Sequence, residues 1–170
     1  MKKILFIDRD GTLLEEPKSD KQLDSFDKLS FFPGVFKYLN KISEELDFKL
    51  VMVTNQDGLG TGSFPEETFW PVQNFIINSF KNEEVNFFKI HIDKSFENEN
   101  SNYRKPRTGM LTEYIEDCKI DMQNSFVIGD RGSDMQLAKN LSCSAILYNG
   151  TDLNDSLNDV VKLKTDSWKS

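Results

Sequence analysis

The sequence is poor in the side chains that most often hold zinc or form disulfides, because its 170 residues include only two cysteines and one histidine. Cys118 and Cys143 lack the paired spacing of a zinc or redox motif, and we expect both to be small, buried apolar side chains. We also expect no targeting segment. The opening stretch MKKILFIDRDG holds an apolar run too short for a signal peptide, so we expect a soluble, cytoplasmic protein.

Positive charge is scarce as well. The chain has 21 Lys and Arg against 28 Asp and Glu, a formal net charge of −7. This balance disfavours a nucleic-acid backbone or an anionic membrane as the main partner, and it attracts a cationic or metal-bound ligand. A phosphate-bearing ligand therefore needs positive charge concentrated at its site.

The length and the composition, which is 38% hydrophobic, suit one compact domain. We predict a single domain over residues 1–170, with a core at about 3–150 and a polar tail at 151–170 that carries a short helix. Short β-rich apolar runs alternate with helical patterns, which is typical of βαβ units on a parallel sheet. The predicted strands are residues 3–8, 49–54, 86–93, 125–129 and 144–148, and the predicted helices are 33–45, 65–83, 108–118 and 133–140.

Two acidic residues close the first predicted strand, where Asp8 and Asp10 are followed by Gly11 and Thr12. Residues two apart on a strand point the same way, so the two carboxylates converge on one small volume. Gly11 lets the chain turn back there, with backbone N–H groups free to face an anion. Carboxylates this close repel unless a cation lies between them, and Mg²⁺ is the expected cation because it prefers oxygen ligands.

Polar residues also follow two other predicted strands. Thr54 and Asn55 end the second, and Asp130 ends the fourth, while Lys105 lies just before the third predicted helix. In open α/β sheets the ligand lies beyond the carboxyl ends of the strands. We therefore expect these side chains to meet Asp8 and Asp10 at one edge of the sheet.

These four segments together resemble the haloacid dehalogenase superfamily of phosphatases, which use an Asp nucleophile, a Thr or Ser, a Lys and a distal Asp in that order. The match covers roughly residues 3–150. It implies an α/β fold, a three-layer Rossmann-like parallel sheet with helices on both faces. The short interval between the first two motifs leaves no room for an inserted cap domain, so we expect the capless type.

The resemblance also implies the role of each site residue. Asp8 would attack the phosphoryl group and form an aspartyl-phosphate, and Asp10 would act as general acid and then general base. Mg²⁺ would be held by Asp8, Asp130 and the backbone carbonyl of Asp10. Phosphate oxygens would be bound by Thr54, Asn55 and Lys105, with Asp134 supporting the site from behind the metal.

More narrowly, residues 5–13, 16–17, 26–29, 33–35, 50–61 and 63–65 resemble the histidinol-phosphate phosphatase domain, which acts in histidine biosynthesis. That domain is often fused to an imidazoleglycerol-phosphate dehydratase, so a fused or separate dehydratase is an implied partner. The implied substrate is a small phosphomonoester, L-histidinol phosphate. Substrate choice would fall to Glu16, Gln56 and Arg104, with Glu16 attracting the cationic leaving group.

Relatives of this type carry a zinc-stabilised loop before the segment Arg104, Lys105, Pro106. Counted back from Arg104, the four ligand positions hold Asp93, Ser95, Ser101 and Tyr103 here. Tetrahedral zinc requires Cys or His, so we predict no structural zinc. The loop at residues 94–107 is then either mobile or pinned by Phe96 and Tyr103.

Three other functions stay open at this stage. A sugar phosphatase, for example one for D,D-heptose 1,7-bisphosphate, shares the same chemistry. A polynucleotide 3′-phosphatase also carries related motifs, but the acidic chain lacks a basic stripe for a polyanion. A non-catalytic phospho-acceptor module is built from similar acids, but it would take one phosphoryl group and stop.

Overall fold

A computed structural model describes residues 1–150 and 153–170 of the chain. Thr151 and Asp152, where the predicted polar tail begins, lie outside the described residues. No helix in the part of the chain that the structure describes is long and apolar enough to cross a membrane.

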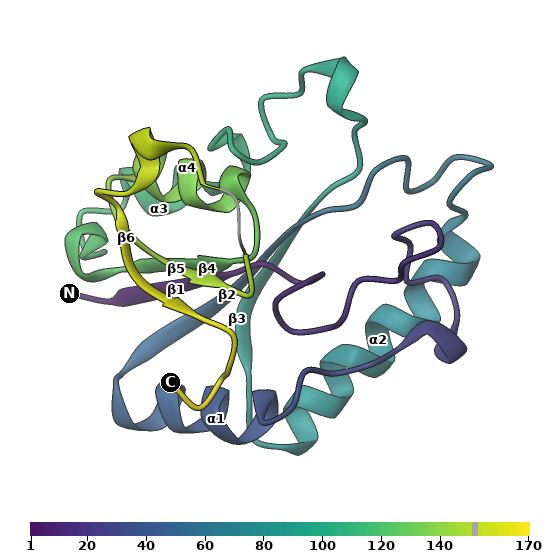
Figure 1. The fold of residues 1–170 in the computed structure, drawn as a ribbon, viewed down its shortest axis with the longest axis horizontal. Coiled ribbons are helices and arrows are strands. Elements are labelled where there is room, and N and C mark those ends of the chain that lie inside the picture. Colours follow the sequence, from purple (N-terminus) through teal and green to yellow (C-terminus); the bar gives the residue numbers. More distant parts are fainter. Residues whose placement is uncertain (151–152) are drawn as a thin grey trace.

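Six parallel strands form one sheet in the order β3-β2-β1-β4-β5-β6 (Figure 1). This confirms the predicted Rossmann-like fold class. The chain first builds the half of the sheet that runs from β1 to β3 and then returns to the other side of β1. The strands are β1 (Lys3–Ile7), β2 (Phe48–Asn55), β3 (Phe87–Asp93), β4 (Phe126–Gly129), β5 (Ser144–Tyr148) and β6 (Val161–Thr165).

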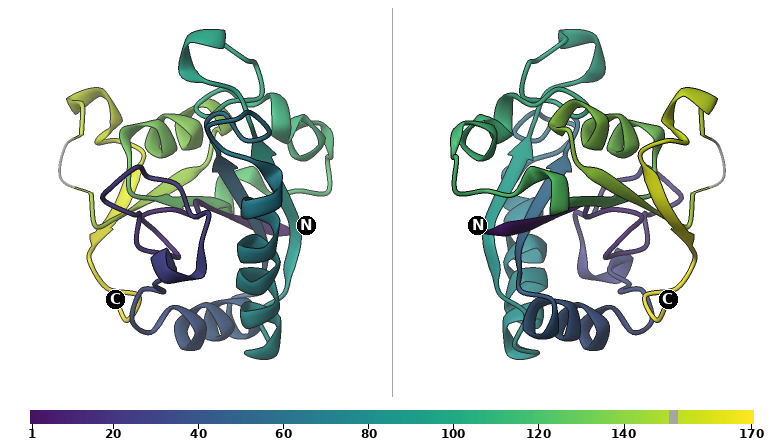
Figure 2. Two further views of the ribbon diagram at one scale, coloured as in Figure 1. Left: turned by 90° about the vertical axis from the view of Figure 1, so that its right-hand side faces the viewer. Right: turned by 90° about the vertical axis from the view of Figure 1, so that its left-hand side faces the viewer.

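Helices cover both faces of the sheet and give three layers (Figures 1 and 2). Helices α1 (Val35–Glu45) and α2 (Glu66–Asn82) lie on one face, and α3 (Thr112–Glu116) and α4 (Gly132–Leu141) lie on the other. Short 3₁₀ turns occupy Phe26–Lys28, Glu97–Glu99, Gly109–Leu111, Met122–Asn124 and Asp155–Leu157. Between β1 and β2 the chain forms one 3₁₀ turn and α1, which leaves no cap domain there.

The central strand β1 is apolar throughout because both of its faces are buried. Leu5 and Ile7 pack into the core beneath α1 and α2, whereas Ile4 and Phe6 pack into the core beneath α3 and α4. This accounts for the continuous apolar run, since a strand buried on both faces shows no alternation. The run stops at Asp8, where the strand leaves the sheet at the edge that carries the site.

The C-terminal tail differs from the prediction. Its predicted short helix is present as the 3₁₀ turn Asp155–Leu157. The tail also forms the strand β6, which was not predicted and which pairs with β5. Farther on, the buried Trp168 packs its ring on Tyr148, with 5.5 Å between ring centroids. Its Nε1 donates a hydrogen bond of 3.0 Å to the backbone oxygen of Thr12. The strand was missed because Lys162, Leu163 and Lys164 are all exposed, so β6 lacks the buried apolar run that marks the other strands.

Two smaller predictions were also wrong. The helix expected at residues 108–118 is a 3₁₀ turn at Gly109–Leu111 followed by the five residues of α3. Cys118, expected to be buried, is exposed just beyond that helix, whereas Cys143 is buried as expected. Cys118 is exposed because α3 ends at Glu116, so the residue lies in the turn after the helix and not on a helix face that packs on the sheet.

Candidate active site

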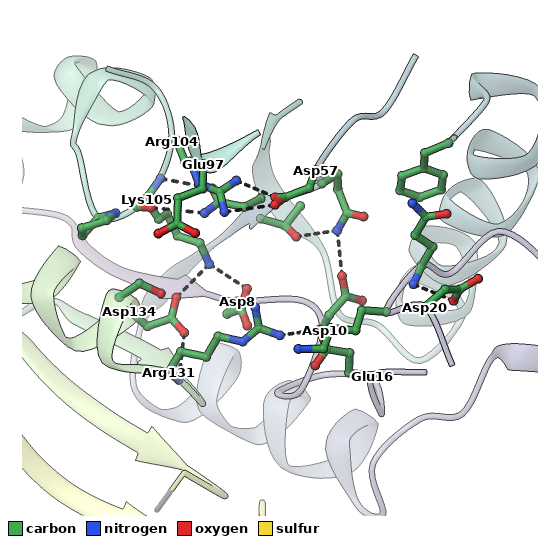
Figure 3. A pocket seen from close by; sticks show the side chains of 18 residues that line it. Asp8, Asp10, Glu16, Asp20, Asp57, Glu97, Arg104, Lys105, Arg131 and Asp134 are labelled. Carbon is green, nitrogen blue, oxygen red and sulfur yellow. Dashed lines mark hydrogen bonds and ion pairs between the residues drawn. The ribbon is translucent and has the colours of Figure 1, made fainter. Parts of the chain in front are cut away.

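Asp8 follows the carboxyl end of β1, Lys105 lies in the loop after β3, and Asp134 lies in the first turn of α4, and the fold brings the three side chains into contact (Figure 3). Lys105 Nζ lies 2.7 Å from Asp8 Oδ1 and 2.8 Å from Asp134 Oδ1. All three side chains are buried. Burial alone would lower the pKa of Lys105, but Asp134 and Asp8 together raise it above its ordinary value. The lysine is therefore a fixed cation against the side chain predicted to be the nucleophile.

Asp130 completes a cluster of three carboxylates. Asp8, Asp130 and Asp134 each offer an oxygen, and these oxygens lie within 4.8 Å of one another. Burial raises the pKa of Asp8 well above its ordinary value, and Asp134 and Asp130 add to the rise, while Lys105 opposes it. Burial also raises the pKa of Asp130.

This cluster fits a hard divalent cation. Asp130 Oδ1 is buried and has no hydrogen-bond partner among the described residues. Asp134, by contrast, is engaged at both oxygens, by Lys105 Nζ and by the backbone N–H of Arg131 at 3.2 Å. An all-oxygen donor set with an unpartnered oxygen suits an ion such as Mg²⁺. Both oxygens of Asp134 thus already have protein partners, and its predicted place behind the metal stays a prediction.

Two glycines allow the carboxylates to approach this closely. Gly11 has a φ of +86°, and a Cβ built there would lie 2.2 Å from Asp130 Oδ2. A Cβ on Gly129 would lie 2.3 Å from the Asp134 carboxyl carbon. Any side chain at either position would push a carboxylate out of the cluster, so both positions require glycine.

The residues at the end of β2 contact Asp10 and Lys105 instead of the three clustered carboxylates. Gln56 Nε2 donates to Asp10 Oδ2 at 2.7 Å and to Thr54 Oγ1 at 2.8 Å. Asn55 Oδ1 accepts from the Lys105 N–H at 3.1 Å, and its Nδ2 donates to the Lys105 carbonyl at 3.2 Å. Asn55 therefore fixes the backbone that carries Lys105, a role that the sequence did not suggest.

Sequence analysis assigned no role to Arg9, which is fully buried. Its Nε donates to Asp10 Oδ1 and its Nη2 to Asp10 Oδ2, each at 3.0 Å. A buried arginine requires an anionic partner. The sequence does show an arginine between two acids at the end of an apolar segment, which could have indicated a buried ion pair. Nothing in the local sequence indicates which acid the arginine contacts.

A pocket of about 420 Å³ opens over these residues (Figure 3). On its rim, Glu16 forms an ion pair with Arg131, and Arg104 contacts Asp57 through both of its terminal nitrogens, one at 3.2 Å. All the residues predicted from the sequence line this pocket except Asp130, which lies beside Asp8 and Asp134 in the carboxylate cluster. Arg131, the ion-pair partner of Glu16, was missed.

The loop at residues 94–107 is held by hydrogen bonds at the positions where its relatives are expected to carry zinc ligands. The buried Asp93 accepts from the Ser95 N–H at 3.2 Å, from the Ser95 hydroxyl and from the Ser101 hydroxyl at 3.4 Å. The Phe96 ring lies against Gly58, where a Cβ would meet it at 2.4 Å. Tyr103 is 60% exposed, so of the two aromatic residues suggested as pins, Phe96 makes the close contact.

The fold and the site define a phosphatase of the haloacid dehalogenase type. A family model described as polynucleotide kinase 3 phosphatase matches residues 3–158, and the chain belongs to that family. Among solved structures, D,D-heptose 1,7-bisphosphate phosphatase from B. bronchiseptica, complexed with magnesium and phosphate, superposes with a TM-score of 0.74. It is 23% identical and covers 92% of this chain and 94% of its own, a likeness of fold alone.

Curated relatives are much more similar in sequence. The histidine biosynthesis bifunctional protein HisB of Spirosoma linguale is 50% identical over 99% of this chain and 47% of the relative. That of Bacteroides fragilis is 53% identical over 98% of this chain and 46% of the relative. The chain thus spans about half the length of these relatives.

Proposed function

We propose that the chain is a Mg²⁺-dependent phosphomonoesterase that hydrolyses L-histidinol phosphate to L-histidinol and phosphate. The observation that carries the reaction type is the contact of Asp8 with Lys105 beside Asp130 and Asp134. The observation that supports the substrate is the 50% and 53% identity, over nearly the whole chain, to proteins named for histidine biosynthesis.

In the first half-reaction, a carboxylate oxygen of Asp8 attacks phosphorus and the bond to the leaving oxygen breaks. Lys105 lies against Asp8 and stabilises the charge on the transferring group. Asp10 gives its proton to the leaving oxygen. In the second half-reaction, water gives a proton to Asp10 and attacks phosphorus. The bond between phosphorus and the Asp8 oxygen breaks and inorganic phosphate leaves, which restores the Asp8 carboxylate and the protonated Asp10.

Asp8, Asp130 and the backbone carbonyl of Asp10 would hold Mg²⁺, which neutralises charge between the nucleophile and the phosphate when it is bound. Asp134 would support these ligands without binding the ion itself, because Lys105 Nζ and the Arg131 backbone N–H occupy its two oxygens. The Thr54 hydroxyl accepts a hydrogen bond from Gln56, so its own O–H is available to a phosphate oxygen. Asn55 contributes by fixing the Lys105 backbone.

The charge of the pocket favours a cationic leaving group. Seven of the lining side chains are acidic and four are basic, so even a bound divalent cation leaves the pocket negative. Coulomb attraction therefore favours an amine or imidazole over a second phosphate or a polynucleotide. Two of the basic side chains, Arg104 and Arg131, are already paired with acids.

A direct test compares kcat/KM for L-histidinol phosphate, D,D-heptose 1,7-bisphosphate and a 3′-phosphorylated oligonucleotide, with Asp8→Asn as the control for contaminating phosphatase. We expect the largest value for histidinol phosphate and none with Asp8→Asn. A preference for the heptose or the oligonucleotide would refute histidinol phosphate as the substrate but would leave the proposed phosphomonoesterase reaction standing. Release of a single phosphate per chain would indicate a phospho-acceptor module instead.

Glu16 is the candidate specificity residue that tests the charge argument. We expect Glu16→Gln to raise KM for histidinol phosphate while KM for p-nitrophenyl phosphate, whose aryl group carries no positive charge, stays the same. Because Glu16 is paired with Arg131, Arg131→Met is the companion variant that removes the partner and frees the carboxylate. An unchanged KM for histidinol phosphate in Glu16→Gln would refute its role.

A fused or separate imidazoleglycerol-phosphate dehydratase stays a prediction from the resemblance, as does the cytoplasmic location. The bifunctional names of the curated relatives support the first. Co-purification from the source cell would test it.

A further inference from the structure

Arg9 is buried with an exposure of 0% and lies against Asp10, which lines the active-site pocket. All three of its nitrogens have partners. Nε and Nη2 hold the two oxygens of Asp10, Nη1 donates to Gln73 Oε1 at 2.7 Å, and Nη2 also donates to Gln56 Oε1 at 3.1 Å.

The surroundings of the guanidinium fix it in place. Gln73 and Phe69 both belong to α2, and the guanidinium carbon lies 5.3 Å from the centroid of the Phe69 ring. Burying this cation removes its hydration, a loss that its charge-assisted hydrogen bonds and the Asp10 carboxylate offset. A neutral apolar side chain would fill the same space without losing hydration. What the arginine adds is its pair of hydrogen bonds to Asp10.

The hydrogen bonds determine how the Asp10 carboxyl group lies. Oδ2 accepts from Arg9 Nη2 and from Gln56 Nε2, whereas Oδ1 accepts from Arg9 Nε alone among the described residues. A carboxyl oxygen has two lone pairs, so Oδ1 keeps one position for a proton. Asp10 lines the pocket, and its carboxyl plane is set by the planar fork of Arg9.

We propose that Arg9 is the positioning residue that orients Asp10 for proton transfer to the leaving group, with α2 holding Arg9 through Gln73. This inference rests on the proposed function, in which Asp10 is the general acid. As the bond between phosphorus and the leaving oxygen breaks, the Asp10 proton moves to that oxygen. Without Arg9, the carboxyl group keeps only the Gln56 contact and can rotate about its own bond.

The test separates proton transfer from the rest of catalysis by changing the leaving group. An alkyl ester such as L-histidinol phosphate needs a proton on its leaving oxygen, whereas p-nitrophenolate leaves without one. Since kcat/KM reports the steps up to release of the alcohol, it isolates the half-reaction in which Asp10 acts as acid. The reference variant is Asp10→Asn, which removes the acid itself.

We expect Arg9→Met to lower kcat/KM for the alkyl ester by about 100-fold and that for p-nitrophenyl phosphate by less than about fivefold. Arg107→Met, a change of the same kind at an exposed arginine outside the pocket, should alter neither value. Circular dichroism and thermal unfolding establish that each variant is folded. Equal losses on both substrates, or no loss, in a folded Arg9→Met would overturn the proposal.

Gln73→Leu provides the second test, because it removes the hydrogen bond between Arg9 and α2 without touching Asp10. It should show the same selectivity at a smaller size, roughly three- to tenfold, which corresponds to one hydrogen bond. If Arg9→Met does not fold, this variant decides the question, and a loss that is equal for the two substrates refutes the role.

The substrate proposal fails separately. A wild-type chain that prefers another alkyl phosphate overturns histidinol phosphate as substrate, and the comparison is then made with that ester. A wild-type chain inactive on every phosphomonoester overturns both proposals.

Discussion

The strongest structural prediction concerns Trp168, two residues from the end of the chain. Its side chain is 6% exposed, its ring packs on Tyr148, and its indole N–H donates to the backbone oxygen of Thr12 in the loop after β1. Trp168→Ala removes a buried ring, which costs about 3–5 kcal/mol of unfolding free energy. In a chain of this length that lowers Tm by roughly 6–20 °C.

Trp168→Phe separates the hydrogen bond from the ring. It keeps most of the packing but leaves the Thr12 oxygen without its donor, so we expect a loss of about 1–2 kcal/mol. Trp70→Phe is the matched control, because Trp70 is 37% exposed on α2 and donates only to the exposed Glu66. It should change stability by less than about 0.5 kcal/mol.

Urea unfolding followed by circular dichroism measures all three variants, with the slope m checked for each so that midpoints convert to free energies. The expected order of stability loss is Trp168→Ala, then Trp168→Phe, then Trp70→Phe. A loss below about 1 kcal/mol for Trp168→Ala, or a loss no greater than that of Trp70→Phe, would refute the conclusion that the C-terminal residues belong to the folded core.

Three further predictions concern the site and the buried thiol. Gly11→Ala should abolish phosphatase activity, since its Cβ would lie 2.2 Å from the Asp130 carboxylate at a φ of +86°, whereas Gly62→Ala, with open space around it, should be as active as wild type; an active Gly11→Ala contradicts the close approach. Because burial raises the pKa of Asp8, its contribution to the stability of the metal-free chain is present below the unfolded value of 3.8 and is lost as the pH rises through the raised folded pKa. Mg²⁺ should restore that stability in wild type and much less in Asp8→Asn, which thermal unfolding with and without the ion measures. An equal rise in Tm for the two chains would contradict a role of Asp8 in holding the ion. Burial raises the pKa of Cys143 to about 12, so a thiol reagent at neutral pH should modify Cys118 alone in the native chain and both cysteines in urea; native labelling of Cys143 would be incompatible with its burial.

Local patterns were enough to place the principal acids. Asp8 and Asp130 follow apolar runs that form β1 and β4, and the carboxyl ends of neighbouring parallel strands share one edge of a sheet. The order of the strands did not have to be known in advance, because any parallel arrangement brings these ends to the same side. Lys105 also reached the edge as expected, across 97 residues of sequence from Asp8.

The pairing of polar side chains around those acids was not accessible in the same way. Arg9 contacts Gln73, 64 residues away, because α2 packs over the first half of the sheet, and no periodicity in either segment specifies that contact. Asn55 was expected to face a phosphate, yet its amide holds the Lys105 backbone. Hydrogen-bond partners of this kind depend on the rotation and height of a helix above the sheet, to within about an ångström.

By itself, the sequence determined the fold class, the edge of the sheet that carries the site and the acids that lie there, because strand periodicity and strand ends are local properties of the chain. Only the tertiary structure decided that the C-terminal residues add a sixth strand, that Trp168 closes over the loop at Thr12, and that Arg9 fixes Asp10. These are contacts between segments far apart in the chain. They depend on how whole layers pack, and a polar edge strand or a buried arginine acquires its meaning only from the partner that packing brings to it.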